Sequence, residues 1–117
     1  PYIKEADTLI IMNEPSLKKF KNRLKNKGLL ILNSSLISSN EKIDKSHFLK
    51  YPFTDIAIKL GNIKVANMVA AGAYLAKNKI IDIKTILKVI EKMAPKDKKD
   101  LLKINKQALF TGMKLVR

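Results

Sequence analysis

The sequence predicts an α/β protein: a parallel sheet in three αβα layers, followed by a helical C-terminal half. Three observations support this prediction. Two short apolar runs, at 8–12 and 29–32, have the length and continuity of strands that are buried on both faces. An amphipathic segment with helical spacing lies between the two runs. Beyond residue 54 the apolar spacing is helical throughout, so the α/β part precedes a run of helices.

A strand followed by an amphipathic helix opens the chain. The strand at 8–12 ends in Asn-Glu-Pro-Ser, where Pro15 suits the first turn of a helix and Ser16 can cap or begin it. The helix then continues with lysines and arginine between apolar residues at helical spacing, which predicts one buried face. These apolar residues are Leu17, Phe20 and Leu24.

A second strand follows this helix. Lys27-Gly28 predicts the end of the helix, because glycine readily adopts the left-handed conformation of a helix C-cap. The strand at 29–32 ends at Asn33-Ser34-Ser35. Strand, helix and strand with tight connections predict a βαβ unit, in which the two strands are parallel.

The middle of the chain predicts a loop, a short strand and a short helix. The polar stretch 38–45 predicts the loop, and 46–52 predicts a strand that Pro52 closes. Thr54 can cap a helix over 55–60, which Gly61 ends.

Residues 61–75 predict a helix that is buried on several sides, because it is apolar almost all round. It begins with a Gly-Asn turn and is rich in alanine, which lets a neighbouring backbone come close. Gly72 costs about 1 kcal/mol relative to alanine in a helix interior, so we expect it to have a packing reason. Asn67, and Asn105 further along, predict buried amides that hold packed helices together.

Two more helices complete the prediction. Asp82 caps an amphipathic helix whose apolar face comprises Ile83, Ile86, Leu87 and Ile90. Residues 95–99 open the last helix. Its inner face would use Leu101, Leu102, Asn105, Ala108, Leu109 and Gly112.

Composition restricts the class of protein. The chain has 117 residues, a formal charge of +14 and no cysteine. Its length predicts a single domain over 1–117. The lack of cysteine excludes disulfides, thiolate chemistry and cysteine-ligated iron–sulfur clusters within this chain. The same lack fits a reducing cytoplasm. No apolar run is long enough to span a membrane, and no signal peptide is visible.

The positive charge has more than one interpretation. All of the 24 cationic residues except Arg23 and Arg117 are lysines, and they are scattered over every segment. A basic nucleic-acid-binding module is one interpretation, although the scarcity of arginine, which offers a bidentate fork, counts against it. A solvated lysine-rich surface, or attraction for an acidic partner or a phosphorylated cofactor, explains the same charge.

The candidate site lies where the two predicted strands end. In parallel α/β sheets, ligands bind beyond the carboxyl ends of the strands, and a helix N-terminus favours anions. Turns and caps use the same residue types, so an ordinary structural role is the alternative. The candidate cofactor-binding residues are Asn13, Glu14, Ser16, Asn33, Ser34 and Ser35.

No catalytic or metal-binding residues are predicted. The four glycines are far apart, which excludes a Gly-rich phosphate loop. His47 is the only histidine, and we expect it at a surface strand edge rather than in a catalytic or metal cluster. Glu14 is the only carboxylate at a predicted strand end, and an interaction with the helix dipole explains it as well as catalysis does.

Five stretches of the chain occur in a characteristic order. They are ADTLIIMNEPSLKKF at 6–20, KNKGLLILNSSLI at 25–37, YPFTDIAIKLGN at 51–62, VANMVAAGAYLA at 65–76 and LLKINKQALFTGMKL at 101–115. In order and spacing they resemble the gamma subunit of the 2-oxoacid:ferredoxin oxidoreductases. The Asn-Glu-Pro-Ser form is closer to the 2-oxoglutarate or branched-chain branch than to the pyruvate branch. The motif G-N-x-x-x-A-N-M adds Asn67 to the candidate cofactor-binding residues.

The resemblance implies a Rossmann-like domain that is truncated at its N-terminus. The family's gamma domain starts with a strand and a Gly-rich turn, and neither is in this sequence. We therefore expect residues 1–117 to be the C-terminal two-thirds of that domain. A parallel sheet without its first strands would expose an edge, so marginal stability or self-association is expected.

The resemblance further implies that this chain is a subunit of an enzyme complex and that the chain itself is not catalytic. Such complexes oxidatively decarboxylate a 2-oxo acid, here 2-oxoglutarate, to an acyl-CoA and pass electrons to ferredoxin or a similar acceptor. Thiamine diphosphate, magnesium, iron–sulfur clusters and CoA would be bound through other subunits, and the gamma subunit would help to position CoA. The implied partners are alpha and beta subunits, with a ferredoxin-like delta subunit as a further candidate.

Two alternatives remain from the residues alone. The net charge supports the nucleic-acid-binding module, which would bind with a steep salt dependence. The two polar strand ends support a free-standing phosphate- or nucleotide-binding α/β domain.

Overall fold

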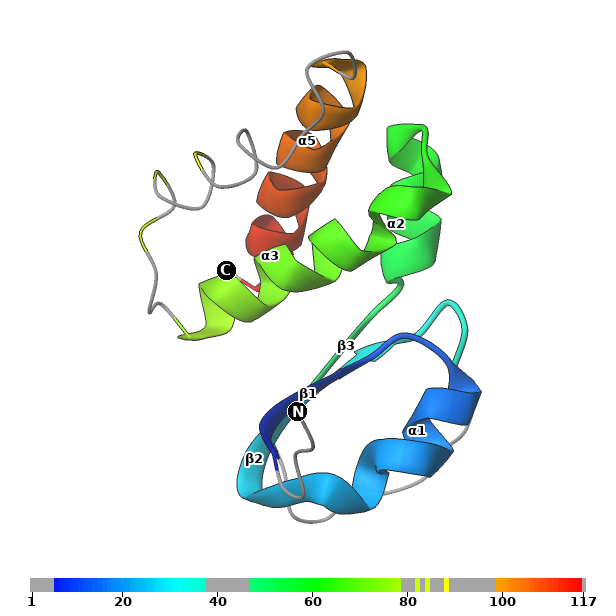
Figure 1. Cartoon of the computed structure of the whole chain (residues 1–117), viewed down its shortest axis with the longest axis vertical. Helices are drawn as coiled ribbons and strands as arrows, with labels where there is room; N and C mark the ends of the chain where they lie inside the picture. The colour runs from blue at the N-terminus through cyan, green and yellow to red at the C-terminus, as the bar shows by residue number, and fades with distance from the viewer. Residues whose placement is uncertain are drawn as a thin grey trace. The chain divides into compact units, whose positions relative to one another are not determined.

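The structure is a computed structural model, and it describes residues 6–37, 47–78, 82, 84, 88 and 99–116. The chain divides into two compact units, Pro1–Pro52 and Phe53–Arg117. The described strands all belong to the first unit, and the second unit is helical where it is described (Figure 1).

The described residues of the first unit form a parallel sheet of three strands. They are β1 (Ala6–Ile11), β2 (Leu24–Asn33) and β3 (His47–Tyr51), in the order β1-β2-β3. In the register of the central strand, Leu30 pairs with Leu9 on one side and Phe48 on the other. The predicted parallel α/β class is therefore confirmed, while the three-layer arrangement stays a prediction.

Strands β1 and β2 differ in burial. Residues 29–32 of β2 are all buried, as predicted for a strand covered on both faces. On β1, Ile11 is buried but Ile10 is 42% exposed, so the prediction of two buried faces is wrong there. The physical reason is position: among the described strands β1 lies at an edge of the sheet, whereas β2 has a neighbour on each side.

The helix after β1 is shorter than predicted. Helix α1 (Glu14–Phe20) is followed by the 3₁₀ turn η1 (Lys21–Arg23), and Leu24 already belongs to β2, where it pairs with Ala6. The predicted place of Leu24 on the helix is therefore wrong. Its apolar side chain nevertheless packs against the buried cluster that contains Leu17.

The predicted helix stop at Lys27-Gly28 is an irregularity of β2 instead. Ala6 pairs with Leu24, but Thr8 pairs with Leu29, so β2 carries extra residues between these pairs. Lys27 has a φ of 64°, so the left-handed residue is the lysine and not the glycine. A Cβ atom on Gly28 would lie 2.9 Å from the Asp7 carbonyl oxygen, which explains the glycine by close approach to β1.

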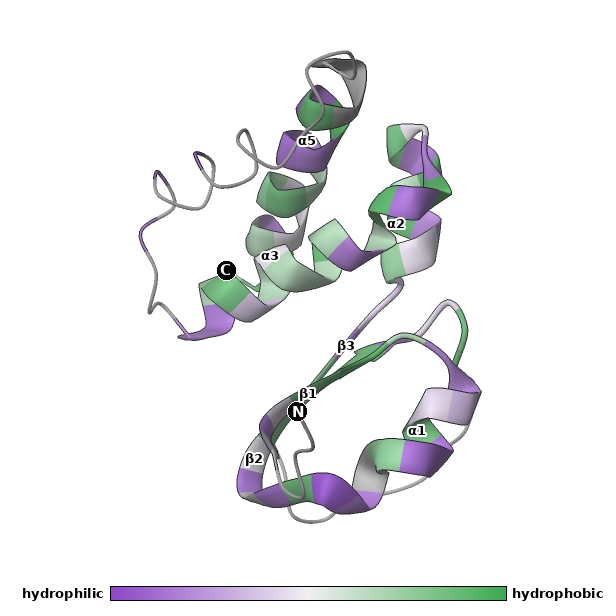
Figure 2. Ribbon diagram, in the orientation of Figure 1, coloured by the Kyte–Doolittle hydropathy of each residue, from purple (hydrophilic) through white to green (hydrophobic). Residues whose placement is uncertain are grey.

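One face of this sheet packs against α1. Leu17 from the helix joins strand residues in a buried apolar cluster, and Phe20 packs at its margin. Figure 2 shows the apolar character of β1 and β2. The buried members of the cluster are Ile11, Leu17, Leu30, Leu32 and Ile37.

Where it is described, the second unit consists of helices and one 3₁₀ turn. The described elements are α2 (Phe53–Leu60), η2 (Ile63–Val65), α3 (Ala66–Asn78) and α5 (Lys99–Val116). Helix α2 begins before the predicted cap Thr54, which is itself buried in the first turn. The predicted helix start at residue 55 is therefore wrong. The helix begins at Phe53, whose fully buried side chain fixes the first turn.

The Gly-Asn turn after α2 is confirmed. Gly61 has a φ of 108°, and its N–H donates to the Ile58 carbonyl at 3.0 Å, which ends the helix. The N–H of Asn62 donates to the Ala57 carbonyl, and its side-chain oxygen accepts from the N–H of Lys64 at 2.9 Å. Asn62 therefore caps η2, the entrance to α3.

Helices α3 and α5 pack at a close crossing made by two glycines. A Cβ atom on Gly72 would overlap the Leu109 carbonyl oxygen and would lie 3.0 Å from the Met113 nitrogen. Reciprocally, a Cβ atom on Gly112 would overlap the Val69 carbonyl oxygen. The predicted packing reason for Gly72 is therefore confirmed, and its partner is the backbone of α5.

Burial on α3 follows one broad face rather than several sides. Its buried residues are Ala66, Val69, Ala70, Gly72 and Ala73. Asn67 is exposed, so the prediction of a buried amide there is wrong. It lies one residue, and thus about 100° around the helix, from buried Ala66. Asn105 on α5 is half-buried.

Further sequence predictions have mixed outcomes. The N–H of Lys84 donates to Asp82 Oδ1 at 3.1 Å, which confirms Asp82 as a cap. The predicted apolar face at residues 83, 86, 87 and 90, and the predicted loop at 38–45, lie outside the described residues. Ala108, Leu109 and Gly112 are buried on α5 as predicted.

None of the helices in the described ranges is long and apolar enough to cross a membrane.

Candidate functional site

The structure brings the carboxyl ends of β1 and β2 together, as the parallel prediction requires. Ile11 and Leu32 are paired in the register, so Met12 and Asn33 follow on adjacent strands. The Asn33 side chain connects them, because its Nδ2 donates to the Met12 carbonyl oxygen at 3.1 Å. These residues are far apart in sequence, and only the sheet makes them neighbours.

Asn33 is fully buried, and both the donor and the acceptor of its side chain form hydrogen bonds. While Nδ2 donates to β1, Oδ1 accepts from the N–H of Ser35 at 3.3 Å. Its carbonyl oxygen accepts from the N–H of Leu36 at 3.2 Å, which closes the turn after β2. A buried amide that satisfies its donor and acceptor in this way is a structural element of the strand ends.

The end of β3 meets the same turn. The N–H of Ser34 donates to the Tyr51 carbonyl oxygen at 2.9 Å. The sequence did not indicate this contact; its only signal was the predicted strand end before Pro52. All three described strands therefore end around the Asn33-Ser34-Ser35 turn.

The first turn of α1 borders this region. Asn13 Oδ1 accepts from the N–H of Ser16 at 3.0 Å, and the Asn13 carbonyl accepts from the N–H of Leu17 at 3.2 Å. Asn13 is therefore the N-cap of α1, the role that the sequence had suggested for Ser16. Glu14 and Ser16 are half-buried in the first turn.

We name Asn13, Glu14, Ser16, Asn33, Ser34 and Ser35 the strand-end cluster. Its polar side chains and backbone groups can hydrogen-bond a ligand, but they include no pair suited to acid–base catalysis. In the part of the chain that the structure describes, no group of three His, Cys, Asp or Glu side chains could hold a metal ion. The seventh candidate, Asn67, lies on α3 in the other unit, so its membership of the site stays a prediction.

A parallel α/β unit with a polar cluster at its strand ends, followed by a helical unit, is the class of protein that the structure defines. The sequence profile of the pyruvate ferredoxin/flavodoxin oxidoreductase family matches residues 1–115. The chain therefore belongs to this family.

One curated relative is the 2-oxoglutarate synthase subunit KorC of Methanocaldococcus jannaschii. It is 30% identical over 113 residues, which cover 91% of this chain and 59% of that protein. The chain thus spans less than two-thirds of the length of this relative.

Solved structures share the fold. The gamma subunit of a keto/oxoacid ferredoxin oxidoreductase from Geobacter sulfurreducens matches 95% of this chain and 64% of its own, with a TM-score of 0.84 at 21% identity. A 2-oxoglutarate:ferredoxin oxidoreductase from Magnetococcus marinus, solved with 2-oxoglutarate, coenzyme A and succinyl-CoA, matches 94% of this chain and 19% of its own, with a TM-score of 0.82 at 20% identity. The resemblance noted in the sequence is confirmed.

Proposed function

We propose that the chain forms the gamma-subunit part of a 2-oxoglutarate:ferredoxin oxidoreductase, which oxidatively decarboxylates 2-oxoglutarate to an acyl-CoA. The observation that carries the proposal is the family match over residues 1–115 together with the 30% identity to a 2-oxoglutarate synthase subunit. Neither comparison supports a nucleic-acid-binding module or a free-standing nucleotide-binding domain.

We further propose that the strand-end cluster contributes to the positioning of CoA. The asparagines and the serines of the cluster have different roles. Asn13 and Asn33 shape the region, because each accepts a backbone hydrogen bond within it. Ser16 and Ser34 use their backbone N–H groups in the bonds described, and their half-buried hydroxyls can hydrogen-bond a polar group of CoA. Glu14, Ser35 and Asn67 remain candidates for the same contact.

The remaining chemistry would come from other subunits. Thiamine diphosphate supplies the carbanion chemistry of such a reaction and iron–sulfur clusters the electron transfer. This chain has no cysteine to ligate such a cluster, so alpha and beta subunits, and a ferredoxin-like delta subunit where present, would hold these groups. Ferredoxin or a similar acceptor would take the electrons.

Co-purification tests the proposal. The chain, carrying an affinity tag in its native host, is expected to recover subunits that contain thiamine diphosphate and iron–sulfur clusters, identified by mass spectrometry and metal analysis. Recovery of the chain without any such subunit would contradict the proposed function. Within the recovered assembly, Ser16→Ala with Ser34→Ala is expected to raise the KM for CoA several-fold while the KM for 2-oxoglutarate stays unchanged. An unchanged KM for CoA would remove the site assignment alone.

A further inference from the structure

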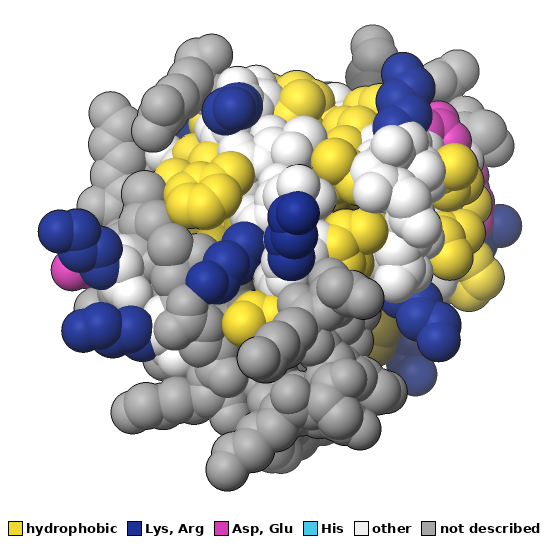
Figure 3. All heavy atoms as spheres, turned by 90° about the horizontal axis from the view of Figure 1, so that it is seen from above, with side chains coloured by type: hydrophobic (Ala, Val, Ile, Leu, Met, Phe, Trp, Pro, Cys, Tyr) yellow, Lys and Arg dark blue, Asp and Glu magenta, His cyan; other side chains and the backbone are white. Residues whose placement is uncertain are grey.

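The densest run of positive charge in the chain lies between residues 18 and 27. Of the ten residues in this run, six are lysine or arginine, and none is aspartate or glutamate. The structure places the run along the end of α1, through η1 and into the first part of β2. Figure 3 shows one face of the molecule, on which cationic side chains lie among hydrophobic and uncharged surface. We name Lys18, Lys19, Arg23, Lys25 and Lys27 the basic track.

Two cations of the basic track are held over an aromatic ring. Lys19 Nζ lies 5.2 Å from the centroid of the Phe20 ring, and the Arg23 guanidinium carbon lies 5.3 Å from it. Phe20 is itself packed against the buried cluster of the first unit. Cation–π attraction therefore restrains these two side chains on a fixed base, so part of the positive surface is ordered before any partner binds.

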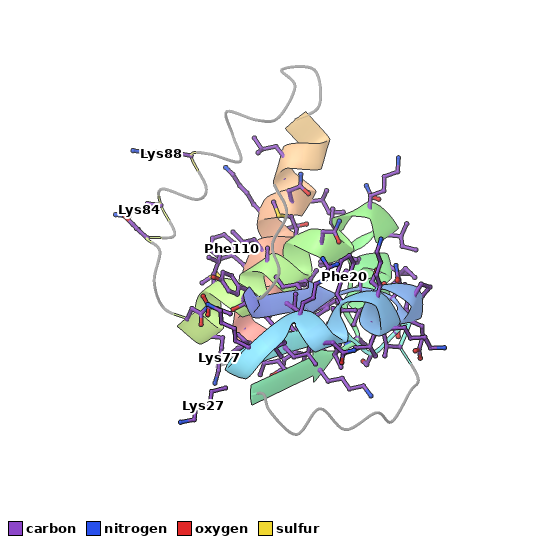
Figure 4. The ribbon with its side chains drawn as sticks, turned by 60° about the horizontal axis from the view of Figure 1, so that its bottom comes forward. Phe20, Lys27, Lys77, Lys84, Lys88 and Phe110 are labelled. Carbon is purple, nitrogen blue, oxygen red and sulfur yellow. The ribbon has the colours of Figure 1, made fainter. Side chains whose placement is uncertain are left out.

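Lys27 is held in a conformation that lysine disfavours. Its φ of 64° lies in the left-handed region, where a side chain costs about 1 kcal/mol and glycine costs nothing. The side chain is exposed and projects away from the ribbon (Figure 4). A strained backbone that presents an exposed charge is an observation from which a function can be inferred.

The four lysines of the basic track are exposed. Asp7 lies 3.4 Å from Lys25, but their side chains are 87% and 48% exposed, so the pair is a weak surface interaction. Lys27 lies six residues before Asn33 on β2, a separation of at most about 20 Å, whereas Lys18 and Lys19 share α1 with Glu14 and Ser16 of the strand-end cluster, so the track extends well beyond that cluster.

We propose that the basic track docks a carboxylate-rich surface of another subunit of the oxidoreductase assembly. The inference rests on the proposed function for the identity of the partner. Lysine carries a compact positive charge on a flexible stem, and four of the five residues of the track are lysines, so its charge is complementary to a surface of carboxylates. A nucleic acid fits less well, because Lys19 and Arg23 already lie over the ring of Phe20 that a base would have to stack on.

Salt-dependent release of the chain from the assembly tests this inference. The assembly is purified through a tag on the wild-type chain, treated with nuclease and washed with increasing NaCl, and the alpha and beta subunits retained at each step are quantified. The charge-reversed variant combines Lys18→Glu, Lys19→Glu and Lys27→Glu. The control combines Lys59→Glu, Lys64→Glu and Lys114→Glu, which makes the same change of charge at exposed positions of the second unit.

The charge-reversed variant is expected to release the subunits at an NaCl concentration about twofold or more below that of the wild-type chain, because exposed charge pairs are screened by salt. The control is expected to behave like the wild-type chain. A milder variant, with Lys18→Gln, Lys19→Gln and Lys27→Gly, guards against misfolding and is expected to shift in the same direction.

Equal release from the charge-reversed variant and the wild-type chain would overturn the inference while leaving the proposed function intact. Equal loss from the control would overturn it too, because net charge would then be the cause. Loss of the subunits from the wild-type assembly on nuclease treatment would assign the track to nucleic acid. If the wild-type chain recovers no such subunits at low salt, the proposed function fails, and the inference with it.

Discussion

The two units hold their elements together by opposite means. At the strand ends of the first unit, the side chain of Asn33 connects β1 to the turn after β2. At the α3/α5 crossing of the second unit, Gly72 and Gly112 lack side chains, and the two backbones touch. The first arrangement depends on a hydrogen-bonding side chain, and the second depends on the absence of a side chain. A motif residue can therefore be required for the hydrogen bonds of its side chain or for the absence of a side chain. Substitutions at each position distinguish the two cases.

The largest effect is expected at the helix crossing. Gly72→Ala or Gly112→Ala should destabilise the second unit by about 3 kcal/mol, because the added methyl group meets backbone that cannot rotate away. Amide hydrogen exchange would show faster exchange in α3 and α5 than in the strands of the first unit. Ala71→Ser adds one atom at a half-buried position of α3 and serves as the control, with an effect below about 0.5 kcal/mol. A tolerated Gly72→Ala would show that the crossing is looser than described.

The strand ends should respond less strongly. Asn33→Ala removes the buried donor to Met12 and the acceptor for Ser35, and is expected to cost about 2 kcal/mol. Hydrogen exchange should accelerate at Ser35 and along the ends of β1 and β2, in contrast to the pattern expected for Gly72→Ala. Asn22→Ala, at an exposed position of η1, controls for the loss of an asparagine. Unchanged exchange in Asn33→Ala would mean that the amide does not hold the strands.

The cap of α1 offers a smaller test. Asn13→Ala should cost about 1 kcal/mol, because the N–H of Ser16 loses its acceptor. Asn13→Asp keeps an acceptor oxygen and should retain most of the stability in urea denaturation. The capping role would be wrong if both variants lost the same free energy of unfolding.

The smallest expected change is a gain. Lys27→Gly should stabilise the first unit by about 0.5 kcal/mol, because glycine adopts the left-handed conformation without the strain that lysine has there. Lys27→Ala removes the same charge without relieving the backbone and should bring no such gain. If both variants are equally stable in thermal unfolding, the left-handed conformation is not the source of strain.

Sequence patterns predicted the Gly-Asn turn and the cap at Asp82, because these features depend on neighbouring residues. They also predicted the parallel strands, because a strand, a helix and a strand with tight connections form a βαβ unit. They failed where the outcome depended on distant residues. The length of α1 was overestimated, since Leu24 has helical spacing but pairs with Ala6 in the sheet. Asn67 was expected to be buried, although its direction around α3 exposes it.

The candidate site was predicted in part. Its position at the strand ends followed from the parallel arrangement. The bond between Asn33 and Met12 did not, because no local pattern pairs residues on separate strands. Gly72 was expected to have a packing reason, but the sequence alone did not identify Leu109 as its neighbour.

The most direct test of the proposed function is the anaerobic reduction of a viologen dye by the assembly purified through a tag on this chain. We expect reduction to require both 2-oxoglutarate and CoA, with pyruvate reacting at least about tenfold more slowly, a preference of about 1.4 kcal/mol in the transition state. Dye reduction that is absent with every 2-oxo acid, although thiamine diphosphate and iron–sulfur clusters are present, would contradict the proposal. So would a rate with pyruvate that exceeds the rate with 2-oxoglutarate.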